Sequence, residues 1–245
     1  INKKKYNKEF YENQQNQIFD KLNLDRNLGL KKLNRIKEKH SFLNELEMRS
    51  EHQVLFSSLS CSTKLDINEI LEIGTFDGSN AFLFSLLFEN SNIETIDLES
   101  NQDDFKNFYE RKNNISKFIE VRNQNLLRSN KINFREINSI NLINYKKKYD
   151  LIWIDGAHGY PVVCMDILNS IKLIRAGGYI ICDDIHVNSI NSDKMYRSNA
   201  GNETLNELKK EGIINFNLIF KRLDAENNCL EENRKFIAIV SLTTS

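Results

Sequence analysis

Three carboxylates and one histidine stand where two strand-like apolar runs end. Asp155 ends the first run and His158 follows three residues later, while Asp183 and Asp184 end the second run. If the two runs form neighbouring parallel strands, about 4.8 Å apart, these side chains converge at the carboxyl edge of a sheet. Open α/β sheets bind their ligands at that edge, so the four residues form a candidate site.

The chemistry of this site follows from its residue types. Carboxylates in a small volume repel one another, and a hard divalent cation with oxygen ligands relieves the repulsion. We therefore expect Asp155, Asp183 and Asp184 to bind Mg²⁺ or Mn²⁺, because Zn²⁺ favours His and Cys. His158, with an ordinary pKa of about 6.5, could serve as a general base. The alternatives are helix caps at Asp155 and His158 and solvated strand ends at the acidic pair.

A glycine-punctuated turn after the run Ile70–Ile73 forms a second candidate site. Gly74 and Gly78 let the backbone turn tightly and approach a ligand closely. A helix that begins after Gly78 would present free N–H groups to anionic atoms. The third glycine of the dinucleotide-binding fingerprint is replaced by Ser79, so the match to a dinucleotide site is poor.

Two acids accompany this turn. Glu72 lies inside the apolar run, where an unpaired buried carboxylate is costly, and a ligand ammonium would be a suitable partner. Asp97 lies near the end of the next run, and its two oxygens could accept both hydroxyls of a ribose. For Asp97 the alternatives are a helix cap or a solvated acid.

The elements that must position these residues follow from the apolar pattern. Short apolar runs alternate with amphipathic segments at intervals of roughly 20–30 residues, which is typical of βαβ units. The pattern predicts an α/β fold with a doubly wound, seven-stranded, mostly parallel sheet and an antiparallel last strand. The expected strands are Ile70–Ile73, Ile93–Leu98, Phe118–Val121, Leu151–Ile154, Tyr179–Cys182, Phe216–Leu223 and Phe236–Leu242. Helices are expected at about 79–89, 102–112, 160–175 and 201–211.

The first part of the chain has a different composition. Residues 1–40 hold 11 Lys or Arg against 5 Asp or Glu, although the whole chain has 34 of each. We expect residues 1–60 to form a helical N-terminal extension and residues 61–245 to form the α/β domain. The basic helices could dock an anionic partner or join copies of the chain into a homo-oligomer.

Composition argues against several classes of protein. The formal net charge of zero argues against a protein that coats nucleic acid. No apolar run approaches the length of about 18 residues that a membrane-spanning helix needs. The four cysteines lack metal-ligand spacing and indicate a reducing compartment, so we expect a cytoplasmic protein.

The glycine turn also resembles a known family. The string Glu72-Ile-Gly74-Thr75-Phe76-Asp-Gly78-Ser-Asn80 is similar to the donor loop of class I S-adenosylmethionine-dependent methyltransferases, in the variant found in catechol- and caffeoyl-CoA-type O-methyltransferases. The resemblance covers about residues 52–242. It implies that these residues contact the methionine part of S-adenosylmethionine and that Asp97 binds the ribose. It further implies an adenine contact among Asn123, Gln124 and Asn125, of which we select Asn125.

The acidic site carries a second part of the resemblance. Asp155-Gly-Ala-His158-Gly-Tyr160, followed by the pair Asp183-Asp184, is similar to bacterial sugar O-methyltransferases of the macrolide type. The resemblance implies transfer of a methyl group to a hydroxyl of a small molecule, such as a sugar or another polar metabolite. His158 and Asp155 would be catalytic, with a bound divalent metal. The alternatives are a nicotinamide-dependent oxidoreductase, a metal-independent methyltransferase of the same fold, and a binding module.

Overall fold

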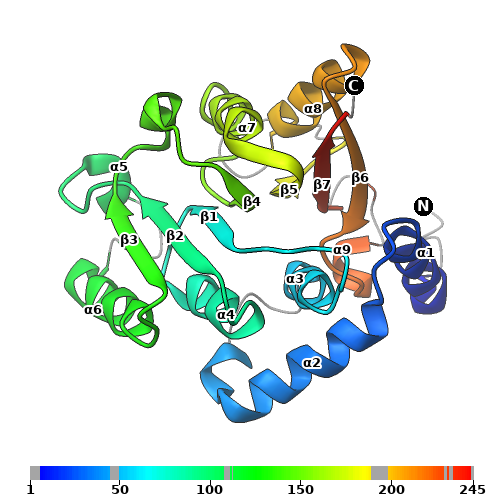
Figure 1. The fold of residues 1–245 in the computed structure, drawn as a ribbon, viewed down its shortest axis with the longest axis horizontal. Coiled ribbons are helices and arrows are strands. Elements are labelled where there is room, and N and C mark those ends of the chain that lie inside the picture. The colour runs from blue at the N-terminus through cyan, green and yellow to red at the C-terminus, as the bar shows by residue number, and fades with distance from the viewer. Residues whose placement is uncertain are drawn as a thin grey trace.

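A single mixed sheet forms the centre of the computed structural model, which describes residues 6–44, 50–107, 111, 113–188, 198–228, 231 and 234–243. Within these residues the sheet has seven strands in the order β3-β2-β1-β4-β5-β7-β6 (Figure 1). The strands are β1 Glu69–Ile73, β2 Asn92–Asp97, β3 Ile132–Glu136, β4 Tyr149–Ile154, β5 Ile174–Ile185, β6 Ile214–Phe220 and β7 Phe236–Leu242.

Strand direction confirms the predicted fold class. The strands β1 to β5 pair in parallel, whereas β7 is antiparallel to both of its neighbours, β5 and β6. The apolar run Leu151–Ile154 in β4 is buried throughout, as expected for a central strand that is covered on both faces. The carboxyl ends of β1, β2, β4 and β5 therefore meet at one edge of the sheet.

Helices cover both faces of this sheet. Figure 1 shows α3, α4 and α6 along one face and α7 and α8 along the other. The helices are α1 Lys8–Lys21, α2 Arg26–Lys39, α3 His52–Ser60, α4 Ser79–Leu87, α5 Asp103–Lys106, α6 Ile115–Leu126, α7 Val162–Leu173, α8 Ala200–Lys210 and α9 Ala225–Asn228, with a 3₁₀ helix at Ser139–Asn144. Among the described helices, none has both the length and the apolar character needed to cross a bilayer.

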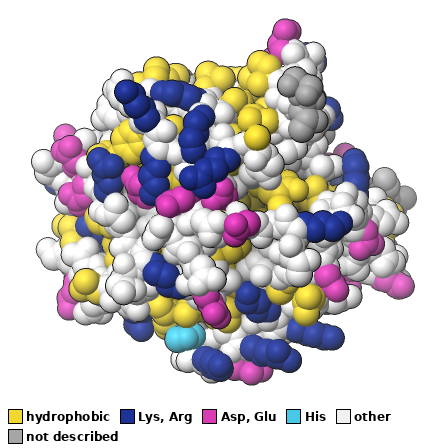
Figure 2. All heavy atoms as spheres, in the orientation of Figure 1, with side chains coloured by type: hydrophobic (Ala, Val, Ile, Leu, Met, Phe, Trp, Pro, Cys, Tyr) yellow, Lys and Arg dark blue, Asp and Glu magenta, His cyan; other side chains and the backbone are white. Residues whose placement is uncertain are grey.

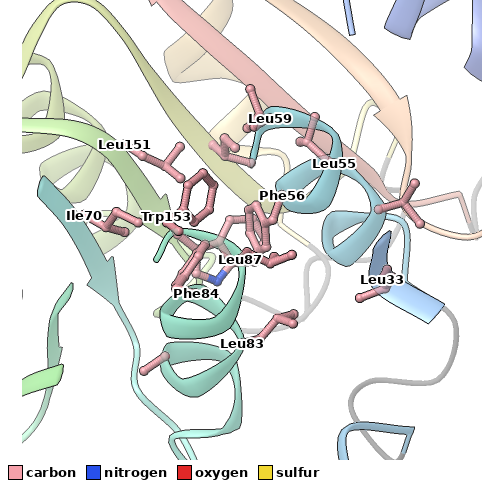
Figure 3. Packing of buried hydrophobic residues seen from close by; sticks show 14 of the residues in the cluster. Leu33, Leu55, Phe56, Leu59, Ile70, Leu83, Phe84, Leu87, Leu151 and Trp153 are labelled. Carbon is pink, nitrogen blue, oxygen red and sulfur yellow. The ribbon is translucent and has the colours of Figure 1, made fainter. Parts of the chain in front are cut away.

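The core between the sheet and the N-terminal helices is aromatic. Phe56 of α3 packs against Trp153 of β4, with ring centroids 5.0 Å apart, and against Phe84 of α4 at 4.6 Å (Figure 3). One continuous cluster of buried side chains extends from Phe19 in α1 to Ile239 in β7. The N-terminal helices thus share a core with the sheet, and Trp153 is a core residue, as its position inside a strand predicts.

One predicted strand is wrong. Phe118–Val121 lies within helix α6, and the third strand is Ile132–Glu136. The apolar residues of α6 recur at helical spacing, and Asn114 caps the helix by accepting a hydrogen bond from the backbone N–H of Lys117. A four-residue apolar run cannot distinguish a helix from a strand, because both elements bury such runs.

The remaining predicted elements agree with the structure where it describes them. The helices expected at 79–89, 160–175 and 201–211 correspond to α4, α7 and α8. Of the helix expected at 102–112, the described part is the short α5, and residues 108–110 and 112 lie outside the described residues. The cysteines at 61, 164 and 182 are free thiols, and Cys229 lies outside the described residues.

Candidate active site

The glycine turn between β1 and α4 is packed directly against the end of β4. Gly74 has φ +103° and Gly78 has φ +75°, in the left-handed region that glycine tolerates best. A Cβ on Gly74 would lie 2.3 Å from the backbone oxygen of Asp155. Only glycine permits this approach, so the turn brings the predicted donor loop beside the predicted catalytic acid.

Glu72 is buried next to this turn, and both oxygens of its carboxyl group accept hydrogen bonds from other side chains of the protein. Asn80 Nδ2 donates to Glu72 Oε1 at 2.7 Å, and Thr95 Oγ1 donates to Glu72 Oε2 at 2.5 Å. Burial raises the pKa of Glu72 to about 8, although these two hydrogen bonds oppose the shift. A contact between Glu72 or Asn80 and a ligand stays a prediction, and the hydrogen bonds already explain why the acid is tolerated.

Asp97 ends β2 and faces the same turn. The backbone N–H of Phe76 donates to Asp97 Oδ2 at 3.2 Å, and Arg111 Nη2 donates to the same oxygen at 3.0 Å. Burial raises the pKa of Asp97, and the positive charge of Arg111 opposes that shift. Arg111 was not predicted; it stacks on the ring of Phe105, with 4.0 Å between the guanidinium carbon and the ring centroid.

Asn125 makes hydrogen bonds to the glycine turn. It lies in α6, and its Nδ2 donates to the backbone oxygen of Asp77 at 2.9 Å and to Ser79 Oγ at 3.1 Å. The adenine contact was predicted there because residues 118–121 were expected to form the third strand. The third strand is in fact followed by residues 137–139. A contact between Asn125 and the cofactor therefore stays a prediction, and its observed hydrogen bonds are structural.

The acidic site assembles at the neighbouring strand ends. Strands β4 and β5 pair with Ile154 opposite Cys182, which places Asp155 and the acidic pair at one edge. His158 Nε2 lies 3.8 Å from Asp155 Oδ1 and 3.9 Å from Asp184 Oδ2. The convergence expected from the sequence is thus present in the structure.

Two lysines that the sequence analysis missed also reach this site. Lys221 Nζ lies 2.5 Å from Asp183 Oδ2 and 2.7 Å from Asp184 Oδ1, and Lys235 Nζ lies 2.5 Å from Asp184 Oδ2. Lys221 directly follows β6 and Lys235 directly precedes β7. Both strands had been expected as an antiparallel pair, and their basic ends could have indicated partners for the acids at the end of β5.

The lysines change the chemistry of the site. Within the described part of the chain there is no group of three or more His, Cys, Asp or Glu residues placed to hold a metal ion. Three of the four oxygens of Asp183 and Asp184 that were expected to bind a cation instead face ammonium groups, and the fourth, Asp183 Oδ1, is buried without a hydrogen-bond partner among the described residues. The residues present therefore do not fit the Mg²⁺ or Mn²⁺ site that the sequence predicted at Asp155, Asp183 and Asp184.

His158 is held in its neutral form by its surroundings. Burial lowers the pKa of His158, while the negative charges of Asp184 and Asp183 oppose this shift. A neutral imidazole can accept a proton, which is the property that a general base requires. Although burial opposes it, the positive charges of Lys221 and Lys235 hold the pKa of Asp184 below its usual range, so Asp184 remains ionised.

Comparison with known proteins gives one family match and many structural likenesses. Residues 71–185 match a family model described as a methyltransferase domain. The O-methyltransferase TomG from Streptomyces achromogenes, solved with S-adenosylmethionine, is 14% identical, with 100% of each chain covered and a TM-score of 0.54. The O-methyltransferase from Bacillus cereus, in complex with S-adenosylhomocysteine, is 14% identical, with 96% of this chain and 100% of that chain covered and a TM-score of 0.54.

A third solved structure is the Podospora anserina methyltransferase PaMTH1 with bound S-adenosylhomocysteine. It is 14% identical, covers 89% of this chain and 88% of its own, and has a TM-score of 0.52. No curated protein matches the sequence. At these identities the likenesses establish the fold alone.

The family match covers residues 71–185, which is slightly less than half of the chain. The matched residues include the glycine turn, Asp97, Asp155 and the acidic pair, so the whole candidate site lies within the matched segment except for the two lysines. The chain has a methyltransferase fold, and this segment of it resembles a methyltransferase domain.

Proposed function

We propose that the protein transfers the methyl group of S-adenosylmethionine to a hydroxyl oxygen of a small molecule. The observation that supports this proposal is the close approach of Gly74 to Asp155, since His158 and its acidic neighbours thus lie near the glycine turn. A base at that position suits an acceptor that loses a proton as it is methylated. The likeness to the O-methyltransferases of Bacillus cereus and Streptomyces achromogenes supports the same acceptor atom.

The donor is proposed to lie over the glycine turn. Gly74 and Gly78 would allow its methionine part to approach the backbone of Thr75 and Phe76, while Asp97 would accept hydrogen bonds from the ribose hydroxyls. Asp97 is already held towards the turn by the backbone N–H of Phe76. The carboxylate is therefore oriented before a ligand binds, which lowers the entropic cost of binding.

When bound, S-adenosylmethionine supplies an electrophilic methyl group on a sulfonium. His158 would accept the proton of the acceptor hydroxyl as the oxygen–carbon bond forms and the carbon–sulfur bond breaks. Asp155 and Asp184, each within 4 Å of His158 Nε2, would stabilise the imidazolium that results. Alignment of the oxygen, the methyl carbon and the sulfur would supply much of the acceleration.

Calorimetric titration tests the proposed donor site. We expect the wild-type protein to bind S-adenosylhomocysteine and S-adenosylmethionine more tightly than NAD. Asp97→Ala should weaken binding of S-adenosylhomocysteine by about 10–100-fold, because hydrogen bonds to a charged group contribute about 1.5–3 kcal/mol. Glu99→Ala, which removes an exposed acid two residues away, is the control and should bind as the wild type does. Tighter binding of NAD, or unchanged affinity in Asp97→Ala, would overturn the proposal.

A further inference from the structure

We propose that Lys221, with Lys235, replaces the divalent cation at the acidic pair, so that methyl transfer in this protein requires no metal ion. The inference deepens the function proposed above and rests on it. It is carried by a positive observation: the ammonium nitrogen of Lys221 lies between carboxylate oxygens of Asp183 and Asp184, at 2.5 Å and 2.7 Å.

Space is the first argument. A Mg²⁺ ion binds its oxygen ligands at about 2.0–2.1 Å in a near-octahedral arrangement. Lys221 Nζ already stands at hydrogen-bonding distance from one oxygen of each acid. An ion that bridged the same two oxygens would overlap the ammonium group. An ion at that position and the ammonium group of Lys221 therefore exclude each other, and the lysine is covalently part of the chain.

Charge is the second argument. Asp183 and Asp184 can carry two negative charges, and the two lysines supply the same two positive charges as one divalent cation. Addition of a divalent ion to the lysines would leave an excess of positive charge in a site where Lys221 is only 2% exposed. Uncompensated buried charge is strongly unfavourable, so an acidic pair that two lysines already neutralise disfavours a further cation.

The backbone that carries Lys221 is fixed on two sides. The N–H of Lys221 donates to the backbone oxygen of Lys235 at 2.9 Å, and its own backbone oxygen accepts from the N–H of Glu51 at 2.8 Å. Glu51 is in turn bound by Arg26, with both N···O distances at 2.9 Å. Lys221 is thus anchored between the last two strands and the segment that begins α3, unlike a mobile surface lysine.

The proposed role of Lys221 is that of a positioning residue. It holds one oxygen of Asp184 while Lys235 holds the other, and the latter oxygen also faces His158 Nε2 at 3.9 Å. The pair of lysines thereby keeps the acidic group ionised and oriented beside the proposed base. A metal ion performs the same neutralising and orienting task where no lysine is present.

Binding of Mn²⁺, followed by electron paramagnetic resonance, tests this replacement without any knowledge of the acceptor. After treatment with a chelator, the wild-type protein should bind no Mn²⁺ at the acidic pair at millimolar ion concentration. The double variant Lys221→Met with Lys235→Met keeps the aliphatic chains but removes both charges. It should gain affinity for Mn²⁺ by about tenfold or more, because two local positive charges are lost.

Two further samples control the experiment. Lys210→Met removes a lysine that pairs with exposed Glu207 on α8, and its Mn²⁺ binding should match the wild type. If the double variant does not fold, Lys235→Met alone, whose side chain is 24% exposed, should show a smaller gain. One tightly bound Mn²⁺ per wild-type chain would overturn the replacement, as would a folded double variant without any gain. Titration with S-adenosylhomocysteine in the same samples reports separately on the proposed function.

Discussion

A single buried acid shows how strongly position controls chemistry in this protein. Glu72 has an ordinary pKa of 4.5, which burial raises to about 8. The folded protein therefore holds this proton to a higher pH than the unfolded chain does. The contribution to stability is complete below about pH 4.5 and is lost as the pH rises towards about 8.

The direction of this pKa shift leads to a testable prediction for the variant Glu72→Gln. The variant has no proton to lose, so its unfolding free energy should fall less than that of the wild type between pH 5 and pH 8. Urea denaturation at several pH values measures both curves. Glu99→Gln, at an exposed position, should follow the wild-type curve. Parallel curves for Glu72→Gln and the wild type would contradict the raised pKa.

His158 is the residue on which the proposed proton transfer depends. We expect His158→Gln to lower kcat by about 10²–10⁴-fold, which is the usual contribution of a general base. Affinity for S-adenosylhomocysteine should be unchanged, because the proposed role of His158 is to contact the acceptor and not the donor. Transfer of a labelled methyl group to an acceptor found by screening hydroxylated small molecules provides the measurement.

The control for this prediction is another histidine. His40→Gln changes a residue at the end of α2, in the N-terminal part of the chain, and should leave kcat at the wild-type value. Wild-type kcat in His158→Gln would show that a different group removes the proton. Loss of donor binding in the same variant would show instead that His158 supports the donor loop.

At the scale of the elements, helix α1 makes hydrogen bonds to the backbone of the edge strand β6. The side chain of Gln15 accepts from the N–H of Phe220 at 2.9 Å and donates to the carbonyl of the same residue at 3.1 Å. Phe220 ends the edge strand β6 and immediately precedes Lys221. The helix therefore satisfies backbone groups that would otherwise be unpaired at this edge.

Removal of this pairing should be costly. Gln15→Ala should lower the unfolding free energy by about 1–3 kcal/mol, the usual penalty for a buried backbone group left without a partner. Chemical denaturation measures the change. Gln17→Ala, two residues along the same helix and exposed, should lie within about 0.5 kcal/mol of the wild type. An equal effect of the two substitutions would show that the pairing at Phe220 contributes nothing specific.

The elements also show where sequence patterns are informative. Runs such as Leu151–Ile154 predict a central strand because a strand covered on both faces buries consecutive apolar residues. Phe118–Val121 was wrongly predicted as a strand, because a short helix that buries only one face can contain the same residue types. Lys221 and Lys235 were missed for another reason: a lysine beside a strand end is usually solvated, and only the register of β5, β6 and β7 reveals their partners.

At the scale of the whole molecule, the basic side chains are not confined to the N-terminal residues. The basic N-terminal helices do not stand apart from the acidic remainder of the chain, because they share a hydrophobic core with the sheet. Figure 2 shows Lys and Arg side chains near the lower rim, and a second gathering at the upper left. A hollow of about 480 Å³, lined by residues that include Lys146, Lys148 and Lys172, lies where β4 begins and thus opposite the candidate site.

The position of Lys221 and Lys235 in the chain has a consequence for biosynthesis. Both are made after the parallel strands, on the hairpin that completes the sheet. A nascent chain that ends at β5 carries Asp183 and Asp184 without their cations, and these acids repel each other until the hairpin docks. Strands β6 and β7 therefore complete both the sheet and the ion pairs of the candidate site.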